Sequence, residues 1–383
     1  MKFTFIITTL MCLLSVTQTT QGQESGNKIF DLLIGTYTRS GKSVGIYVYT
    51  FNGETGEFNY KSEMPGITNP SFLVISKDRK NVYSVGEVGR GRGNISAFSF
   101  DALTGKLEFL NSASSGGDGP CYITVDDQKK YVFAANYGGG SLCAIPVKPD
   151  GSLGPSIQSI RHEGSSINRE QDRARVHSTV LSPDNRYLFV SDLGTDKINI
   201  YHVDVTKPNP LAPAEQSFVH VETGSGPRHF TFHPNGKFAY VIQEILGIVT
   251  AFDYKDGTLT IIQSVSMPSS DYKGPADHAD AADIHISPDG KFLYGSLRGS
   301  INEIVIYAID DNGKLTFAGR QSTLGKTPRN FAIDPTGNYL LVGNSGNDEI
   351  VIFKRDQKTG LLTPTDKKIS VGSPVCLKFV AID

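Results

Sequence analysis

The sequence contains no tryptophan and only four cysteines among its 383 residues. Cys12 lies in an apolar N-terminal segment, and Cys121, Cys143 and Cys376 are far apart, so neither a disulfide framework nor a zinc-ligand spacing is present. No amphipathic helical stretch of useful length follows residue 20, which argues against a fold rich in helices. The net charge of -2 comes without a basic run, and this argues against a nucleic-acid-binding surface.

Two hydrolase motifs are absent as well. The chain has no Gly-x-Ser-x-Gly segment, which carries the nucleophile of many serine hydrolases. It also has no His-Glu-x-x-His segment, which holds zinc in many metalloproteases. No other cluster of ligands in the sequence suggests a metal site.

The N-terminal segment, residues 1–22, differs in kind from the rest of the chain. Lys2 is followed by an apolar run over residues 3–16, and polar residues come next. This is the layout of a secretory signal, and it is too short and too weakly flanked for a transmembrane anchor. We expect cleavage at its end, export to the periplasm or out of the cell, and a mature domain over residues 23–383. Lipid attachment at Cys12 is the alternative, but a bulky methionine precedes this cysteine where a small residue is wanted.

Glycine, proline, tyrosine and phenylalanine are plentiful, and they recur in a fixed order. Each copy has a strand, a tight turn and a return strand rich in Tyr, Val and Phe, most clearly in GPRHFTFHPNGKFAYVIQE at Gly226–Glu244. Six such turns follow one another at intervals of about 50 residues: Asp78-Arg79, Gln128-Lys129, Asp184-Asn185, Asn235-Gly236, Asp289-Gly290 and Thr336-Gly337. A period of this length with four short strands per unit is typical of a β-propeller. We therefore expect an all-β fold.

Each end of the chain carries part of a further repeat. Phe30–Thr38 and Gly45–Phe51 have the pattern of a return strand and a third strand, with no first strand before them. Ser373–Val380 has the pattern of a first strand with no return strand. Pairing these segments would protect strand edges that an open array leaves exposed. We expect a seven-bladed ring of four-stranded blades, closed by pairing of the N- and C-terminal strands, with an open solenoid as the alternative.

The repeat also predicts which distant residues meet, because the same position of every blade faces one end of the ring. In a hairpin, residues at equal distances from the turn lie opposite each other. The first strands then contribute one row: Ser71, Cys121, His177, Arg228, Ala282 and Arg329. The return strands contribute a second row: Glu87, Tyr137, Leu193, Glu244, Arg298 and Ser345. Charged side chains are seldom buried unless they are paired or functional, so the rows indicate a polar pocket at one mouth of the central channel.

Two pairs in this pocket have expected partners. His177 falls nearly opposite Asp192, whose carboxylate would orient the imidazole. Arg228 falls opposite Glu244, and an ion pair there would shift the pKa of both groups. Either pair could also be purely structural. Candidates for substrate contacts at the same level are Arg329, Glu87, Asn136, Tyr137 and Asp192.

Several segments carry a resemblance to a known family. They are IGTYT and GIYVY (Ile34–Tyr49), NPSFL (Asn69–Leu73), ANYGGGS (Ala135–Ser141), HSTVLSPDNRYLFVSDLGTDKI (His177–Ile198), the Gly226–Glu244 copy, IHISPDGKFLYGSLRG (Ile284–Gly299) and TPRNFAIDPTGNYLLVGN (Thr327–Asn344). With these motifs the chain resembles the lactonase family of seven-bladed propellers, over about Phe30 to Phe379. That family includes the propeller-type 6-phosphogluconolactonase and carboxy-cis,cis-muconate cyclase.

The resemblance implies a set of site residues. The His, the two Arg and the Glu proposed for the family fall on His177, Arg228, Arg298 and Glu244. Two departures stand out: many relatives have a second His where this chain has Arg175, and many have Glu where this chain has Asp283. The first departure lies beside the pocket and leaves the particular lactone open.

This set of residues suits the hydrolysis of a sugar lactone. His177 or Glu244 would supply base and acid functions, and Arg228 and Arg298 would bind an anionic group or stabilise the oxyanion. The resemblance implies a 6-phosphogluconolactonase-like carboxylic ester hydrolase that needs no metal or cofactor. We expect a monomer whose partner is a small lactone, without nucleic acid or a membrane span. The alternatives are a muconate-type lactonising cyclase and a non-catalytic envelope propeller that binds ligands.

Overall fold

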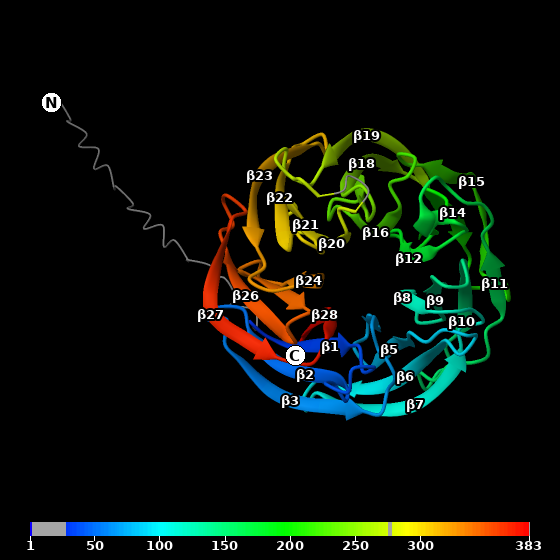
Figure 1. Ribbon diagram of the computed structural model, residues 1–383. Helices are drawn as coiled ribbons and strands as arrows, with labels where there is room; N and C mark the ends of the chain where they lie inside the picture. Colours follow the sequence, from blue (N-terminus) through cyan, green and yellow to red (C-terminus); the bar gives the residue numbers. More distant parts are fainter. Residues whose placement is uncertain (2–27, 275–277, 383) are drawn as a thin grey trace.

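The computed structural model describes Met1 and residues 28–274 and 278–382. Within these ranges the chain forms seven four-stranded antiparallel sheets, arranged as blades around a common axis (Figure 1). The expected all-β, seven-bladed propeller is therefore confirmed. Apart from Met1, the expected signal segment over residues 1–22, including Cys12, lies outside the described residues. Nowhere in the described ranges is a helix long and apolar enough to cross a membrane.

Both ends of the chain build the first blade. Its strands from the axis outward are β28 (Pro374–Ala381), β1 (Ile29–Thr36), β2 (Gly45–Asn52) and β3 (Phe58–Pro65). Leu32 pairs with Phe379, and Ile34 pairs with Leu377, in an antiparallel ladder. This pairing closes the ring as expected, and Figure 1 shows the C-terminus beside β1.

The other six blades each take four consecutive strands, again ordered from the axis outward. Blades 2 and 3 are β4 (Leu73–Ile75), β5 (Asn81–Gly86), β6 (Asn94–Asp101), β7 (Lys106–Ser114), and β8 (Pro120–Val125), β9 (Tyr131–Asn136), β10 (Ser141–Pro146), β11 (Gln158–Arg161). Blades 4 and 5 are β12 (Val176–Leu181), β13 (Tyr187–Asp192), β14 (Lys197–Val203), β15 (Leu211–His220), and β16 (Pro227–Phe232), β17 (Phe238–Gln243), β18 (Ile248–Lys255), β19 (Thr258–Ser266). Blades 6 and 7 are β20 (Ala281–Ile286), β21 (Phe292–Leu297), β22 (Glu303–Ile309), β23 (Leu315–Ser322), and β24 (Pro328–Ile333), β25 (Tyr339–Asn344), β26 (Glu349–Arg355), β27 (Leu362–Ser370).

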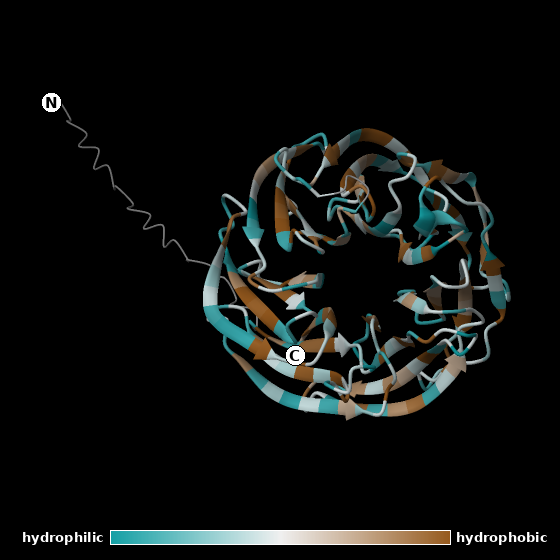
Figure 2. Cartoon of the chain, in the orientation of Figure 1, coloured by the Kyte–Doolittle hydropathy of each residue, from teal (hydrophilic) through white to brown (hydrophobic). Residues whose placement is uncertain are grey.

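The core lies between the blades. Every residue of the second strands β5, β9, β17, β21 and β25 is buried, whereas the outermost strand β19 has one buried residue, Leu259, and β3 has none. In Figure 2 the outer strands β3 and β27 accordingly carry long hydrophilic stretches. Tyrosines of the second strands also link neighbouring blades, since the Tyr240 hydroxyl donates to the Gly313 carbonyl (2.9 Å) and that of Tyr294 to Gly360 (2.8 Å). This recurring bond explains why the return strands are rich in tyrosine.

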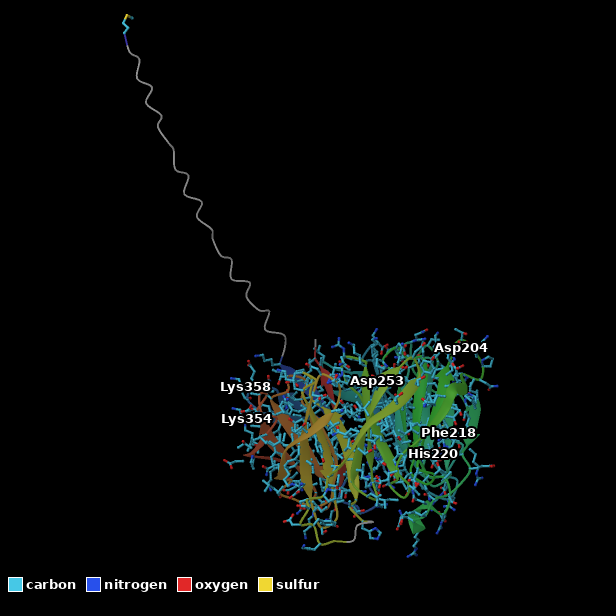
Figure 3. The ribbon with its side chains drawn as sticks, turned by 90° about the horizontal axis from the view of Figure 1, so that it is seen from above. Asp204, Phe218, His220, Asp253, Lys354 and Lys358 are labelled. Carbon is cyan, nitrogen blue, oxygen red and sulfur yellow. The ribbon has the colours of Figure 1, made fainter. Side chains whose placement is uncertain are left out.

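The turn that joins the first two strands of a blade is tight. In blade 5 the Gly236 amide donates to the His233 carbonyl at 2.9 Å, and Gly236 has a φ of 69°. This left-handed conformation is available to glycine without a steric penalty. Seen edge-on in Figure 3, the ring is a short cylinder, and this turn and the site described below lie at opposite ends of the blade.

Candidate functional site

The innermost strands share an irregularity near their start. In blade 4, Val176 pairs with Asp192 and Ser178 pairs with Ser191, so His177 is an extra residue without a cross-strand partner. The corresponding extra residues of blades 3, 5 and 7 are Cys121, Arg228 and Arg329. A β-bulge of this kind bends the strand and changes the direction of the side chain. The first row of candidate residues thus includes four bulged residues, Cys121, His177, Arg228 and Arg329.

The bulge makes one expectation wrong. Asp192 does not orient His177, because the extra residue shifts the register and places Val176 opposite Asp192. The Asp192 carboxylate instead accepts a hydrogen bond from the Arg175 amide (2.7 Å) and lies 2.9 Å from Nδ1 of His162. Asp192 is fully buried in the blade, where it fixes the loop before β12.

Glu244 is the centre of the cluster. Its Oε2 accepts a hydrogen bond from Nε of Arg228 at 2.7 Å, as expected, and its Oε1 lies 2.8 Å from a terminal nitrogen of Arg298. The Nε2 of His177 lies 3.8 Å from Oε2. Burial alone would raise the pKa of Glu244, but the positive charges of Arg298 and Arg228 outweigh it and lower the pKa to about 2. Glu244 is therefore a carboxylate at neutral pH.

Arg228 lies behind Glu244 as seen from the mouth. Its side chain is 1% exposed, compared with 22% for Glu244 and 12% for Arg298. One terminal nitrogen donates to Nε2 of His229 (3.0 Å) and to the Ala282 carbonyl. Burial lowers the pKa of Arg228 to about 10, so it remains a cation at neutral pH. The guanidinium is shielded from the mouth by the carboxylate that it holds.

His229 was not among the sequence candidates, although it follows Arg228 directly. Its Nδ1 lies 2.7 Å from Oδ1 of Asp283, and Oδ2 of Asp283 lies 2.9 Å from Nε2 of His285. Arginine only donates hydrogen bonds, so Nε2 of His229 must accept from Arg228 and its Nδ1 must carry the proton given to Asp283. Burial, together with the charge of Arg228, lowers the pKa of His229 to about 3, which keeps this tautomer neutral.

His177 is enclosed by polarisable neighbours. Its ring lies 5.3 Å from that of Tyr137 and 5.4 Å from that of His229, edge to face in both cases. The Sγ of Cys121 lies 3.8 Å from Nδ1 of His177. Burial, followed by the charge of Arg228, lowers the pKa of His177 well below its usual range. The imidazole is therefore neutral at pH 7, with Nε2 directed toward Glu244.

A cavity of about 280 Å³ opens above Glu244, lined by Tyr137, Glu170, Leu193, Glu244, Ile245, His278 and Asp280. Tyr137 and Glu244 were predicted, whereas Glu170 comes from a short 3-10 helix (η1, Arg169–Gln171) and Asp280 from the loop before β20. Both are loop residues outside the hairpin repeat, so the repeat gave no signal for them. Arg175 lies beside the cavity, with its guanidinium 5.4 Å from the Tyr137 ring centroid.

The remaining candidates divide into two groups. Glu87 accepts a hydrogen bond from the Tyr37 hydroxyl at 2.9 Å, and the Arg329 guanidinium lies 5.5 Å from the Tyr37 ring centroid, so this group adjoins the cluster. Asn136, in contrast, is fully buried, and its amide donates to the Ser115 carbonyl at 3.1 Å. Asn136 therefore lies within the blade and does not itself line the cavity, although the next residue, Tyr137, does. No three His, Cys, Asp or Glu residues in the described ranges are placed to hold a metal ion.

The fold and this cluster define a closed seven-bladed propeller with a candidate active site at one mouth. The family model described as "Lactonase, 7-bladed beta-propeller" matches residues 31–379. The chain belongs to this family.

Named relatives and solved structures match nearly the whole domain. A 6-phosphogluconolactonase of Formosa agariphila is 38% identical over 91% of this chain and 99% of the relative. One of Bacillus subtilis is 34% identical over 91% of this chain and 97% of the relative. The crystal structure of a putative 6-phosphogluconolactonase from Bacteroides fragilis has a TM-score of 0.88, 42% identity, and coverage of 94% of this chain and 100% of that one. The periplasmic gluconolactonase of Pseudomonas aeruginosa has a TM-score of 0.88 and 36% identity, with coverage of 93% and 100%.

Proposed function

We propose that the protein is a lactone hydrolase of the 6-phosphogluconolactonase type, acting on a sugar lactone. Family membership and the names of the relatives support this reaction class. The observation that carries the proposal is the pairing of an ionised Glu244, which lines the cavity, with a neutral and buried His177, whose Nε2 lies 3.8 Å from Oε2 of Glu244. Both groups are unprotonated at neutral pH, as a general base must be before it takes a proton from water.

The gap between the two groups suits a water molecule. A single water molecule, with its oxygen about 2.8 Å from both Oε2 of Glu244 and Nε2 of His177, would hydrogen-bond to both atoms at once. It would attack the lactone carbonyl, give one proton to this pair, and form a tetrahedral oxyanion. When the ring C–O bond breaks, the same proton passes to the departing alkoxide, and the product is a hydroxy acid.

Arg298 would stabilise the oxyanion. Its side chain is 12% exposed, compared with 1% for Arg228, and a negative charge on the substrate would compete with Glu244 for its hydrogen bonds. As Arg298 turns toward the oxyanion, the pKa of Glu244 rises, because its largest stabilising charge is withdrawn. The carboxylate thus becomes a stronger base as the transition state forms. The Tyr137 hydroxyl, which makes no hydrogen bond within the described part of the chain, would donate to a substrate oxygen.

Arg228 acts as a positioning residue in this scheme. It is shielded from the mouth, and it fixes the Oε2 atom that faces His177. The neutral His229 and the Asp283 carboxylate hold the guanidinium from behind. Asp283 therefore determines the tautomer of His229, and through it the position of Glu244.

We further propose that the lactone is unphosphorylated. The charged residues lining the cavity are Glu170, Glu244 and Asp280, so a phosphate group would meet three carboxylates there, while the nearby Arg298 is paired with Glu244 and Arg175 with Asp172. The export signal expected from residues 1–22 fits such a substrate, because phosphorylated sugars are mainly cytoplasmic. We accordingly place the protein in the periplasm, as the similarity to a periplasmic gluconolactonase supports. The monomeric state remains a prediction.

The lactonising cyclase is less well supported. A muconate-like dicarboxylate would need two accessible cations, and of the two arginines that hold Glu244 only Arg298 reaches the mouth. The second alternative, a propeller that binds ligands without catalysis, would be indicated by binding of a lactone without turnover in the assay described next.

The test is a hydrolysis assay of the purified mature domain on gluconolactone, 6-phosphogluconolactone and muconolactone, with spontaneous hydrolysis subtracted. We expect saturable turnover of gluconolactone that exceeds turnover of its phosphorylated form. Preference for the phosphorylated lactone would overturn the substrate assignment alone. Binding without turnover of any lactone would overturn the catalytic proposal.

A further inference from the structure

A second cavity lies at the other end of the channel. It has a volume of about 350 Å³, and its walls come from the innermost strands or their flanking residues in five blades, with Phe72 at the edge of a sixth. The residues that matter for its chemistry are Phe72, Tyr122, Thr231, His229, His285 and Lys378. His229 separates this channel cavity from the proposed catalytic cluster, because its ring contacts both Tyr122 (5.2 Å) and His177 (5.4 Å).

Three polar groups of the channel cavity are left without partners. Among the described residues, no hydrogen bond or ion pair engages the Lys378 ammonium, the Tyr122 hydroxyl or the Thr231 hydroxyl. Lys378 has only a contact with the face of the Phe72 ring, 4.5 Å from its centroid. Burial raises the pKa of Tyr122, so its hydroxyl is a hydrogen-bond donor at neutral pH. The cavity therefore presents three donors, one of them charged.

The Asp283 carboxylate also lines the channel cavity, but it is not paired with Lys378. Its Oδ1 faces His229, and its Oδ2 is engaged by His285 at 2.9 Å, by the Asn330 side chain and by the Phe331 amide at 3.2 Å. These four donors occupy the carboxylate, so it forms no ion pair with Lys378, while its negative charge remains at the wall of the same cavity. Lys378 is thus a cation inside the channel with no carboxylate of its own, an arrangement that favours an anion from solution.

The apolar walls of the channel cavity determine which kind of molecule carries the anionic group. Phe72 stacks on Tyr122 with 4.0 Å between ring centroids, and Val180, Leu181 and Phe232 complete an apolar surface. Such a surface suits a flat or branched hydrocarbon body and offers little to a polyhydroxylated sugar acid.

We propose that the channel cavity is a second ligand site, which binds a small carboxylate with an apolar body. The carboxylate is held by Lys378, Tyr122 and Thr231, and the body packs on Phe72, Leu181 and Phe232. This site lies beyond the proposed lactone site, and it stands whether or not that site hydrolyses lactones.

Titration of the full mature domain with 4-fluorobenzoate, followed by fluorine NMR, tests the proposal. We expect saturable binding, and binding of the neutral 4-fluorobenzamide at least about tenfold weaker, because the ammonium pairs only with the anion. Lys378→Met keeps most of the side-chain volume and should weaken 4-fluorobenzoate binding at least about tenfold. Tyr122→Phe keeps the stacked ring and should weaken it several-fold.

Two variants separate this site from the rest of the surface. Lys354→Met removes an exposed lysine from the outside of blade 7 (Figure 3) and should leave the affinity unchanged. Arg298→Ala alters the proposed lactone site and should also leave it unchanged. Loss of binding with Arg298→Ala but not with Lys378→Met would place the ligand at the other mouth and overturn the proposal, as would absence of saturable binding. If Lys378→Met does not fold, an unchanged affinity in Tyr122→Phe overturns it.

Discussion

The two ends of the innermost strands differ although the same hairpin builds both. At the turn end the ladder stays regular up to the turn, as Phe232 opposite Ala239 shows. At the other end a bulge interrupts the ladder in one blade after another, and the extra residue is His177, Arg228 or Arg329. Charged side chains gather where the pairing is irregular. The repeated hairpin therefore builds the blades, and the bulge near the start of the innermost strands places the charged side chains at one mouth of the channel.

The largest effect is expected when one residue at each end of blade 5 is substituted in turn. Glu244→Gln should lower kcat on the lactone substrate by about 100-fold to 10,000-fold, because the amide cannot accept the proton from water. His233→Ala at the turn end should leave kcat within about twofold, since it removes two bonds remote from the cluster, one to the Gly290 carbonyl (2.8 Å) and one from the Asn235 amide (3.1 Å). Steady-state kinetics with melting curves as a folding control would measure both. Equal losses at the two ends would contradict the assignment of catalysis to the bulged end.

Acid should destabilise the fold through the bulged end. His177 and His229 have pKa values below the ordinary 6.5 because they are buried, so below pH 6.5 they bind protons in the unfolded chain but not in the folded one. Stability is therefore fully present above pH 6.5 and falls with decreasing pH, by at most about 1.4 kcal/mol per pH unit for each histidine, until the folded pKa is reached. Denaturant unfolding at several pH values between about 6 and 4 would show this. His177→Gln should reduce the slope, and an unchanged slope would contradict the burial argument.

Arg298→Ala probes binding at the mouth. Loss of a charge-assisted hydrogen bond costs about 1.5–3 kcal/mol, so kcat/KM should fall by about 10-fold to 100-fold. The matched control is Arg320→Ala, which breaks a comparable ion pair with Glu303 (2.9 Å) on the outer strands. A similar fall in both variants would indicate a general loss of stability instead of a specific role.

Asp283→Asn tests the connection between the two ends. An asparagine oxygen cannot accept all the donors that now reach Asp283, so the tautomer of His229 is no longer fixed. We expect kcat to fall by about tenfold with a smaller change in KM, because Arg228 would lose its orientation. Asp283→Glu should recover most of the activity. If kcat were unchanged while stability fell, Asp283 would have a structural role only.

The sequence predicted the ring well because the signal is repeated. Six hairpins and two terminal segments require the same strands in every blade, and Leu32 opposite Phe379 confirms how the ends close. The ion pair of Arg228 with Glu244 was also predicted, since an error of one residue in register still leaves long side chains within reach. Asp192 was misplaced for the same reason, because it is short and the bulge turns His177 away from it.

Other parts of the site have no repeated pattern. Glu170 and Asp280 come from loops that differ between blades, so the hairpin register says nothing about them. The bond from His229 to Asp283 joins different blades, and its detection needs the distance between strands that are far apart in sequence. That Arg228 lies behind Glu244 also depends on burial in three dimensions, which residue types alone do not give.

The strand pair that closes the ring has a mechanical consequence. Phe30 lies opposite Ala381, so the chain enters and leaves the domain at the same end of one antiparallel ladder. A force that pulls the two termini apart loads one pair of residues at a time, as in a zipper, instead of shearing the whole ladder at once. The same proximity means that a short linker could join the termini and new ends could be opened in an exposed outer turn. Such a circular permutant would keep the residues around Glu244 in place. Its β28–β1 pairing would resist separation by force, because neither strand would end in a free terminus.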